Sequence, residues 1–226
     1  MAGRMADRLS GGPAGRSADS EAGAIARREA LRQGAAYSTN AGYDMSIEFE
    51  TERCRLRPFR LADLLAFAAY RADPEIAQYQ SWSDYSYDDA LALYEDMAGK
   101  PFGLHGHWYQ IAVADKENDR LLGDVALHFV DRQTVEVGFT MSPGVQRRGY
   151  GREVLRGLVD TVFASLAPER IVAVTDAKNI ASIRVLEAIG FEREALVRTV
   201  EFKGQPGQEY DYVYLRKTWL ARQRAA

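Results

Sequence analysis

The stretch that most constrains this chain runs from residue 135 to residue 166 and reads as a strand, a glycine-rich loop and a helix. Apolar residues alternate with polar or small ones at its start, which is the period of a strand with one buried face. Pro143 and Gly144 end that strand. From Val154 onward the apolar residues recur at helical spacing, so a long amphipathic helix is predicted to begin just after the loop.

The loop of residues 144–151 is predicted to hold a phosphate. A helix N-terminus offers unpaired N–H groups and a partial positive charge, and glycines let a phosphate approach the backbone closely. Two nucleotide motifs do not fit. A dinucleotide fingerprint would need a glycine where Val154 stands, and a P-loop would need Lys and Ser/Thr where Tyr150 and Gly151 stand. The remaining alternatives are a third phosphate motif or a glycine-rich turn that binds no ligand.

The third motif, Q/R-x-x-G-x-G/A, is satisfied by Gln-Arg-Arg-Gly-Tyr-Gly at residues 146–151. Together with a second typical run from Asn179 to Phe191, it makes the chain resemble the GNAT N-acetyltransferase superfamily over about residues 53–219. The resemblance implies acetyl-coenzyme A (acetyl-CoA) as the cofactor and acetyl donor. Its pyrophosphate would then be held by Gln146, Arg147, Arg148, Gly149, Tyr150 and Gly151.

The resemblance also implies the fold, an α/β architecture with a GNAT-like mixed central sheet of about seven strands flanked by about four helices. Strand patterns lie at about residues 47–56, 108–114, 121–130, 135–142, 170–175, 195–202 and 208–215. Helical patterns lie at about residues 61–71, 87–97 and 152–166, and in a segment that stops at Gly190. In the first helix the residues expected to face inward are Leu64, Leu65, Phe67 and Ala68. The aromatic segment between the first two helices is similar to the RimJ/RimL-like branch of the superfamily.

Residues 1–44 differ in composition from the rest and are predicted to form a disordered or weakly helical tail, whereas residues 45–226 form the acetyltransferase domain. The tail is rich in Gly, Ala, Arg and Ser and has almost no large apolar residue before Leu31. Such a segment cannot bury enough surface to offset its chain entropy. Met45 stands just before the first strand pattern, so it is an alternative start of the protein.

Charge and cysteine content narrow the class of partner. The net charge is −3 and the pI is about 5.7, so no overall basic field favours nucleic acid or an anionic membrane, and neither is expected as a partner. No apolar run reaches membrane-spanning length. The single Cys54 excludes an internal disulfide framework and suits a reducing cytoplasm. We therefore expect a cytoplasmic monomer or homodimer with a buried, unreactive thiol.

Acetyl transfer to an amine requires a neutral amine, a polarised thioester carbonyl and a stabilised leaving thiolate. In the superfamily the central strand polarises the carbonyl through a backbone N–H and binds the pantetheine arm at its edge. The resemblance places these contacts at Phe139, Thr140 and Met141. Glu136 is the candidate base, because a Glu in the Glu-x-Gly-aromatic pattern faces the acceptor in RimJ/RimL-like enzymes. The alternative for Glu136 is an ion pair with an arginine at the sheet surface.

Two residues of the second run are also assigned from the resemblance. Asn179 is expected to bind the pantetheine amides, although Asn equally suits a helix N-cap at this boundary. The Tyr that often serves as general acid would fall at Leu186, so the chain departs from the family there. Ser182 is the nearby hydroxyl. It is expected to contact the coenzyme and to hydrogen-bond the sulfur, since Ser is a weak acid.

Aromatic residues and one histidine are the candidates for acceptor binding: Trp82, Tyr85, Trp108 and His128. The alternative for each is an ordinary core or sheet position. His105 and His107 have no carboxylate cluster nearby, so no metal is expected. The predicted function is acetyl transfer to a primary amine, either a protein N-terminus or a small molecule. The alternative function is a non-catalytic module that binds or senses acyl-CoA.

Overall fold

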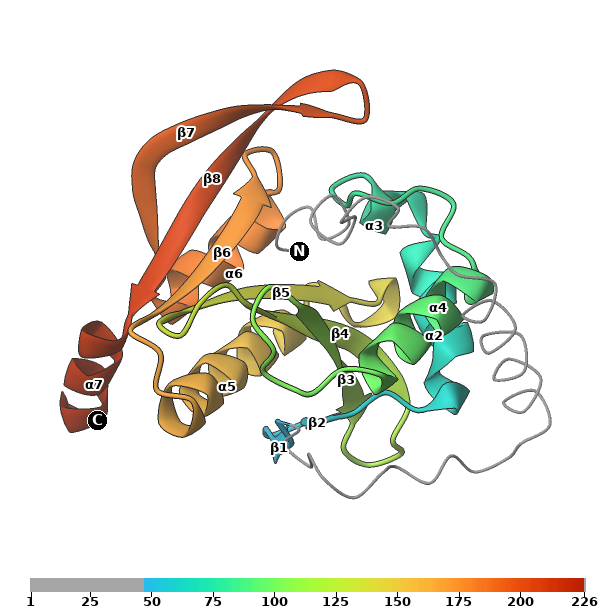
Figure 1. Ribbon diagram of the computed structural model, residues 1–226, viewed down its shortest axis with the longest axis horizontal. Coiled ribbons are helices and arrows are strands. Elements are labelled where there is room, and N and C mark those ends of the chain that lie inside the picture. The colour runs from blue at the N-terminus through green and yellow to red at the C-terminus, as the bar shows by residue number, and fades with distance from the viewer. Residues whose placement is uncertain (1–46, 226) are drawn as a thin grey trace.

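The computed structural model describes residues 47–225 (Figure 1). The predicted tail of residues 1–44 and the alternative start at Met45 lie outside the described residues. Within residues 47–225, no helix combines the length and the apolar character that crossing a lipid bilayer requires.

The described residues form one mixed sheet of eight strands in the order β1-β2-β3-β4-β5-β6-β8-β7. The pairing is antiparallel everywhere except between β5 and β6, which run parallel. The strands are β1 (Phe49–Glu50), β2 (Cys54–Arg57), β3 (Trp108–Asp115), β4 (Leu121–Phe129), β5 (Thr134–Met141), β6 (Arg170–Asp176), β7 (Glu192–Phe202) and β8 (Gln205–Leu215).

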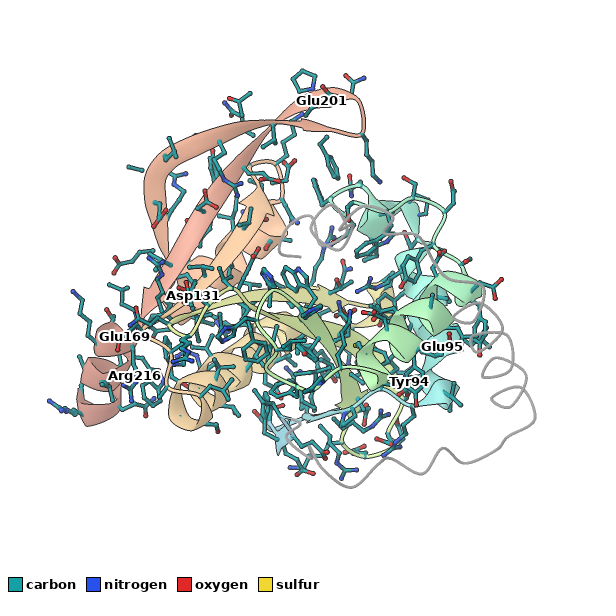
Figure 2. The ribbon with its side chains drawn as sticks, in the orientation of Figure 1. Tyr94, Glu95, Asp131, Glu169, Glu201 and Arg216 are labelled. Carbon is teal, nitrogen blue, oxygen red and sulfur yellow. The ribbon has the colours of Figure 1, made fainter. Side chains whose placement is uncertain are left out.

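Helices cover both faces of the sheet (Figure 1). They are α2 (Leu64–Arg71), α3 (Pro74–Ala77), α4 (Tyr87–Ala98), α5 (Tyr150–Ser165), α6 (Ile180–Ile189) and α7 (Arg216–Ala225), with short 3-10 turns at Leu61–Asp63 and Pro143–Val145. The apolar stripes of α5 and α6 pack on the sheet face that carries Val135, Val137 and Phe139. The helices α2 and α4 pack together on the opposite face, against Ala112. The long β7–β8 hairpin extends from the end of the sheet, with Glu201 near its tip (Figure 2).

The predicted α/β fold is confirmed, and the extra strand has a specific cause. The segment 47–56 was expected to be one strand, but a turn at residues 51–53 divides it into β1 and β2. The Thr51 amide bonds the Cys54 carbonyl at 2.8 Å, and the Thr51 hydroxyl and Arg53 amide both donate to Glu153 of α5, at 2.6 and 2.8 Å. A carboxylate about a hundred positions away therefore holds the turn.

Two further differences concern the helices. Leu65 was expected to face inward but is 71% exposed, so that prediction was wrong. The inward stripe of α2 instead continues through Tyr70 and Arg71. The helices α3 and α7 were not predicted, because α3 has only four residues and α7 buries none of its own residues.

Candidate active site

The β5 and β6 strands separate at the centre of the sheet. Their parallel pairing starts at Thr134 opposite Arg170 and ends at Glu136 opposite Val172. β5 continues to Met141 and β6 to Asp176, where β6 pairs only with β8. On the side that faces away from β4, the backbone of residues 137–141 thus has no neighbouring strand among residues 47–225. Apart from the Met141 carbonyl, which accepts from Gln146, the N–H and C=O groups on that side are available to a bound molecule.

The loop between β5 and α5 passes through two residues of positive φ. Arg147 has a φ of +58°, and Gly149, which precedes α5, has a φ of +83°. Glycine adopts this conformation at little cost, whereas an L side chain is strained there. The Gln146 side-chain amide donates to the Met141 carbonyl at 3.0 Å and so ties the loop to the end of β5. No side chain in the described chain caps α5, so its first N–H groups remain available to an anion.

A cavity of about 600 Å³ lies where the end of β5, this loop, α5 and α6 meet. It brings together eight of the residues that the sequence predicted for the coenzyme. These are Phe139, Met141, Gln146, Arg147, Gly149, Gly151, Asn179 and Ser182. The cavity is more apolar on the side of α6, where Ile180 and Val185 also line it. Its size and its combination of loop amides with apolar walls suit an extended ligand that has an anionic end.

Three predicted coenzyme residues lie outside this cavity. Arg148 lines a neighbouring cavity of about 530 Å³ with Arg53 and Arg152. The Tyr150 ring is buried, and the Arg53 guanidinium lies 3.9 Å from its centroid. Tyr150 therefore packs within the protein and does not line the cavity. Thr140 alternates with the cavity-lining Phe139 and Met141, so its side chain faces the other side of the sheet.

The start of α6 contributes a buried hydroxyl that lacks a hydrogen-bond partner. The Asn179 side chain caps the helix by accepting from the Ser182 amide at 3.1 Å, so its N-cap role is present in the structure. Ser182 Oγ is buried and makes no hydrogen bond within the described residues. A buried unpaired hydroxyl costs free energy, and Ser182 borders the cavity, so a ligand atom could satisfy it. Leu186, where the family's Tyr would stand, is fully buried in the core.

On the opposite face of the sheet, three neighbouring strands bring Glu136, His128 and Trp108 side by side. His128 lies opposite Glu136 across β4 and β5, and Trp108 lies opposite His128 across β3 and β4. His128 Nδ1 is 3.3 Å from Glu136 Oε2, and the indole and imidazole rings stack with centroids 4.8 Å apart. Glu136 is buried, and Arg198 interacts electrostatically with it.

An aromatic wall continues this face towards α2. Trp82 packs on Trp108, and Tyr85 lies 5.5 Å from Trp82 between ring centroids. The guanidinium of Arg71 lies 4.1 Å from the Trp82 ring, and the Arg71 carbonyl accepts the Trp82 indole N–H at 3.1 Å. Burial raises the pKa of Tyr85 to about 12, so its hydroxyl stays protonated at neutral pH. The four residues predicted to bind the acceptor thus form one continuous row of contacts, and the His128 end of this row touches Glu136.

Sequence reasoning missed Arg71 and Asp124, which organise this wall. Arg71 Nη2 lies 3.0 Å from Asp124 Oδ2, both side chains are buried, and Tyr70 donates its hydroxyl to the same carboxylate at 2.5 Å. The available signal was weak. Arg71 ends a helical pattern just before Asp73, and Asp124 is a charged residue within an apolar strand. Charges at positions that a pattern places in the core are rare unless they are paired.

His105 and His107 lie in the loop that precedes β3. Residues 47–225 contain no group of three or more His, Cys, Asp or Glu side chains arranged to hold a metal ion. His105 is exposed in the loop before β3.

A mixed sheet that parts between two central parallel strands, with a phosphate-type loop at the gap, defines the acetyltransferase fold of the GNAT type. Residues 53–192 match the acetyltransferase (GNAT) domain family, and the chain belongs to that family.

Individual proteins are similar to this chain at low sequence identity. The uncharacterised N-acetyltransferase p20 of Bacillus licheniformis is 27% identical over 176 residues, which cover 75% of this chain and 96% of p20. The structure of spermidine N-acetyltransferase from Vibrio cholerae, in complex with CoA and spermine, matches with a TM-score of 0.64 and 22% identity, over 74% of this chain and 98% of that one. The ribosomal-protein-S5-alanine acetyltransferase from Vibrio fischeri matches with a TM-score of 0.61 and 19% identity, over 77% and 99%. These two structures support the fold.

Proposed function

We propose that the protein transfers an acetyl group from acetyl-CoA directly to a primary amine. The observation that carries this proposal is the arrangement around β5. The unpaired strand edge, the loop and the unsatisfied Ser182 hydroxyl lie around one cavity, and the buried Glu136 lies on the other face of the same strand. The parallel pairing of β5 with β6 ends at Glu136, so the candidate base lies where the two strands separate.

The donor side fits acetyl-CoA in three ways. The pyrophosphate would lie on the N–H groups between Arg148 and Gly151, where the positive φ of Gly149 keeps the backbone open. The pantetheine arm would bond the free edge of β5 and the Asn179 region, and an N–H near Thr140 and Met141 would polarise the thioester carbonyl. The Ser182 hydroxyl would hydrogen-bond the sulfur, which supplies the partner that it lacks.

The reaction needs no covalent intermediate on the protein. The amine nitrogen forms the new bond to the acetyl carbon as the carbon–sulfur bond breaks, and coenzyme A leaves as a thiolate that takes up the proton which the nitrogen loses after attack. Glu136 takes the proton from the amine, directly or through one water, and so lets a neutral nitrogen attack. Ser182 stabilises the charge that develops on sulfur.

The acceptor is a primary amine of one of two kinds. We infer a RimJ/RimL-like branch, because the aromatic segment around Trp82 packs on Trp108, which stacks on His128 next to Glu136, and a ribosomal-protein acetyltransferase shares the fold. A protein N-terminus and a small amine such as a polyamine both fit this inference, since a spermidine acetyltransferase shares the fold as well. Each presents a cationic amine, which a buried carboxylate attracts. We place the protein in the cytoplasm as a monomer or homodimer.

Thiol release from acetyl-CoA in the presence of amines tests this function. The assay would compare spermidine with a peptide that has an N-terminal alanine, and mass spectrometry would count acetyl groups on the product. Burial raises the pKa of the Cys54 thiol to about 11, so the protein should add little background. Amine-dependent release with matching acetylation supports the proposal. Tight binding of acetyl-CoA without release by either amine or by a wider amine panel would instead indicate the non-catalytic module.

A further inference from the structure

Three in-register side chains on β3, β4 and β5 form a buried row that the reaction outlined above uses only at one end. Trp108 is opposite His128, and His128 is opposite Glu136. The side chains of His128 and Glu136 are only 11% and 7% exposed. The Trp108 and His128 rings are almost parallel, at 12°. The imidazole is thus held between an indole face and a carboxylate.

This arrangement fixes the hydrogen that the imidazole carries. Glu136 as a carboxylate can only accept a hydrogen bond, so Nδ1 of His128 must donate across the 3.3 Å contact. In a neutral ring Nε2 is then the unprotonated nitrogen. The indole stack restricts rotation of the ring, so the donor stays aimed at Glu136.

Arg198 is a second charged residue close to Glu136. Arg198, which interacts electrostatically with Glu136, forms its ion pairs with Asp211 at 2.6 Å and Glu209 at 3.2 Å. A Glu side chain loses rotamer entropy when it is fixed in one orientation. The His128 contact limits the orientations that the Glu136 carboxylate can take.

We propose that His128 is a positioning residue for the acetyl transfer: its Nδ1–H holds the Glu136 carboxylate in the orientation that takes the proton from the amine, and Trp108 holds the His128 ring. This inference rests on the proposed function, because it assumes that Glu136 is the base. It differs from a role for His128 as the base itself, since only Nδ1 is needed.

Two amide variants separate these roles. In His128→Asn the side-chain N–H₂ replaces Nδ1 and keeps a donor towards Glu136, whereas in His128→Gln the amide reaches the position of Nε2 and the donor near Glu136 is lost. We expect His128→Asn to keep kcat within about threefold of wild type. We expect His128→Gln and His128→Ala to lose about tenfold or more in kcat, a part of the ~10²–10⁴-fold that a general base contributes. The KM for acetyl-CoA should not change, and exposed His105→Asn is the matched control.

The results for these variants assign different roles to His128. Equal losses in His128→Asn and His128→Gln would overturn the positioning role and make Nε2 the acting group. A wild-type kcat in a folded His128→Gln or His128→Ala variant, checked by near-ultraviolet circular dichroism, would reduce His128 to packing. Either result leaves wild-type amine acetylation, and so the proposed function, intact.

Nitrogen NMR of the histidine-labelled full chain tests the pairing even if neither probe amine is acetylated. We expect Nδ1 of His128 to carry a hydrogen in the wild type, since it faces Glu136. In Glu136→Ala the two tautomers should approach the mixture of an unrestrained imidazole. A wild-type His128 that is protonated mainly on Nε2 would overturn the proposal.

Discussion

Glu136 of β5 lies opposite Val172 of β6, and this is the last parallel pair that the two strands form. Beyond it the strands separate, and the cavity bordered by Ser182 and the loop of residues 146–151 opens on the α5 side of the sheet. The residue that marks the end of pairing is also the buried carboxylate next to His128. The proposed donor and acceptor sites lie on the two faces of β5, close to this position, and the predictions below examine each side.

Gly149→Val should weaken coenzyme binding without unfolding the domain. Gly149 has a φ of +83°, so a β-branched residue would strain the loop that precedes the first N–H groups of α5. We expect the Kd for coenzyme A, measured by calorimetry, to rise at least about tenfold, since a residue forced into this region costs roughly 1–2 kcal/mol. Gly144→Ala is the control, because a Cβ there meets no atom within 4 Å. An unchanged Kd in Gly149→Val would place the pyrophosphate elsewhere.

Ser182→Ala separates catalysis from stability. The Ser182 hydroxyl is buried and unpaired in the described residues, so its removal should leave Tm unchanged or slightly raised. If the hydroxyl bonds the leaving sulfur, kcat should fall about tenfold while the Kd for coenzyme A changes little. A loss of Tm with unchanged kcat would show instead that Ser182 serves the fold alone.

Lys203 connects the β7–β8 hairpin to the aromatic segment. Its Nζ donates to the carbonyls of Ala77 at 3.0 Å and Trp82 at 2.8 Å, and burial lowers its pKa. Lys203→Met keeps the chain length but removes both donors. Because Trp82 lies beside the acceptor face, we expect the KM for the amine to rise several-fold, about 1 kcal/mol per lost bond, with the KM for acetyl-CoA unchanged. Exposed Lys217→Met is the control, and equal amine KM values in both variants would contradict the assignment.

Glu153 should stabilise the fold in a pH-dependent way. Burial acts to raise its pKa, but hydrogen bonds from Thr51 and from the backbone and side chain of Arg53 outweigh burial and lower the pKa. A lowered pKa stabilises the folded state above the unfolded value of about 4.3, and this contribution disappears as pH falls through the folded value.

Glu153→Gln is therefore expected to lose about 1–3 kcal/mol in the free energy of unfolding at pH 7. The difference from wild type should shrink below about pH 4, as urea titrations across pH would show. Exposed Glu117→Gln should behave like wild type. A difference that stays constant down to pH 3 would mean that the Glu153 charge is not involved.

The sequence predicted the parts of the site that depend on local patterns. The strand, loop and helix of residues 135–166 have a clear period and turn residues, and Asn179 has the chemistry of an N-cap. These features need no knowledge of distant contacts, so they and the α/β fold could be predicted.

Features that depend on register or on distant partners could not be predicted in the same way. Pairing of His128 with Glu136 requires the β4–β5 register, and a shift by one residue would move either side chain to the other face. The turn between β1 and β2 depends on Glu153, and Arg71 depends on Asp124, partners that no local pattern connects. Leu65 shows the same limit. It is apolar and lies next to the buried stripe of α2, so the sequence pattern assigned it to that stripe, although its side chain is exposed.

Glu136→Gln tests the central claim, that β5 carries acetyl-CoA on one side and a base for the amine on the other. The variant keeps the size and hydrogen-bonding capacity of the side chain but cannot take a proton. We expect kcat for the amine at pH 7 to fall about 10²-fold or more, with the Kd for coenzyme A unchanged. Raising the pH towards the amine pKa, about 8 for an N-terminus and about 10 for an alkyl amine, should restore part of the loss, because neutral amine is then present without a base. A pH–rate profile of Glu136→Gln that matches wild type would contradict the account.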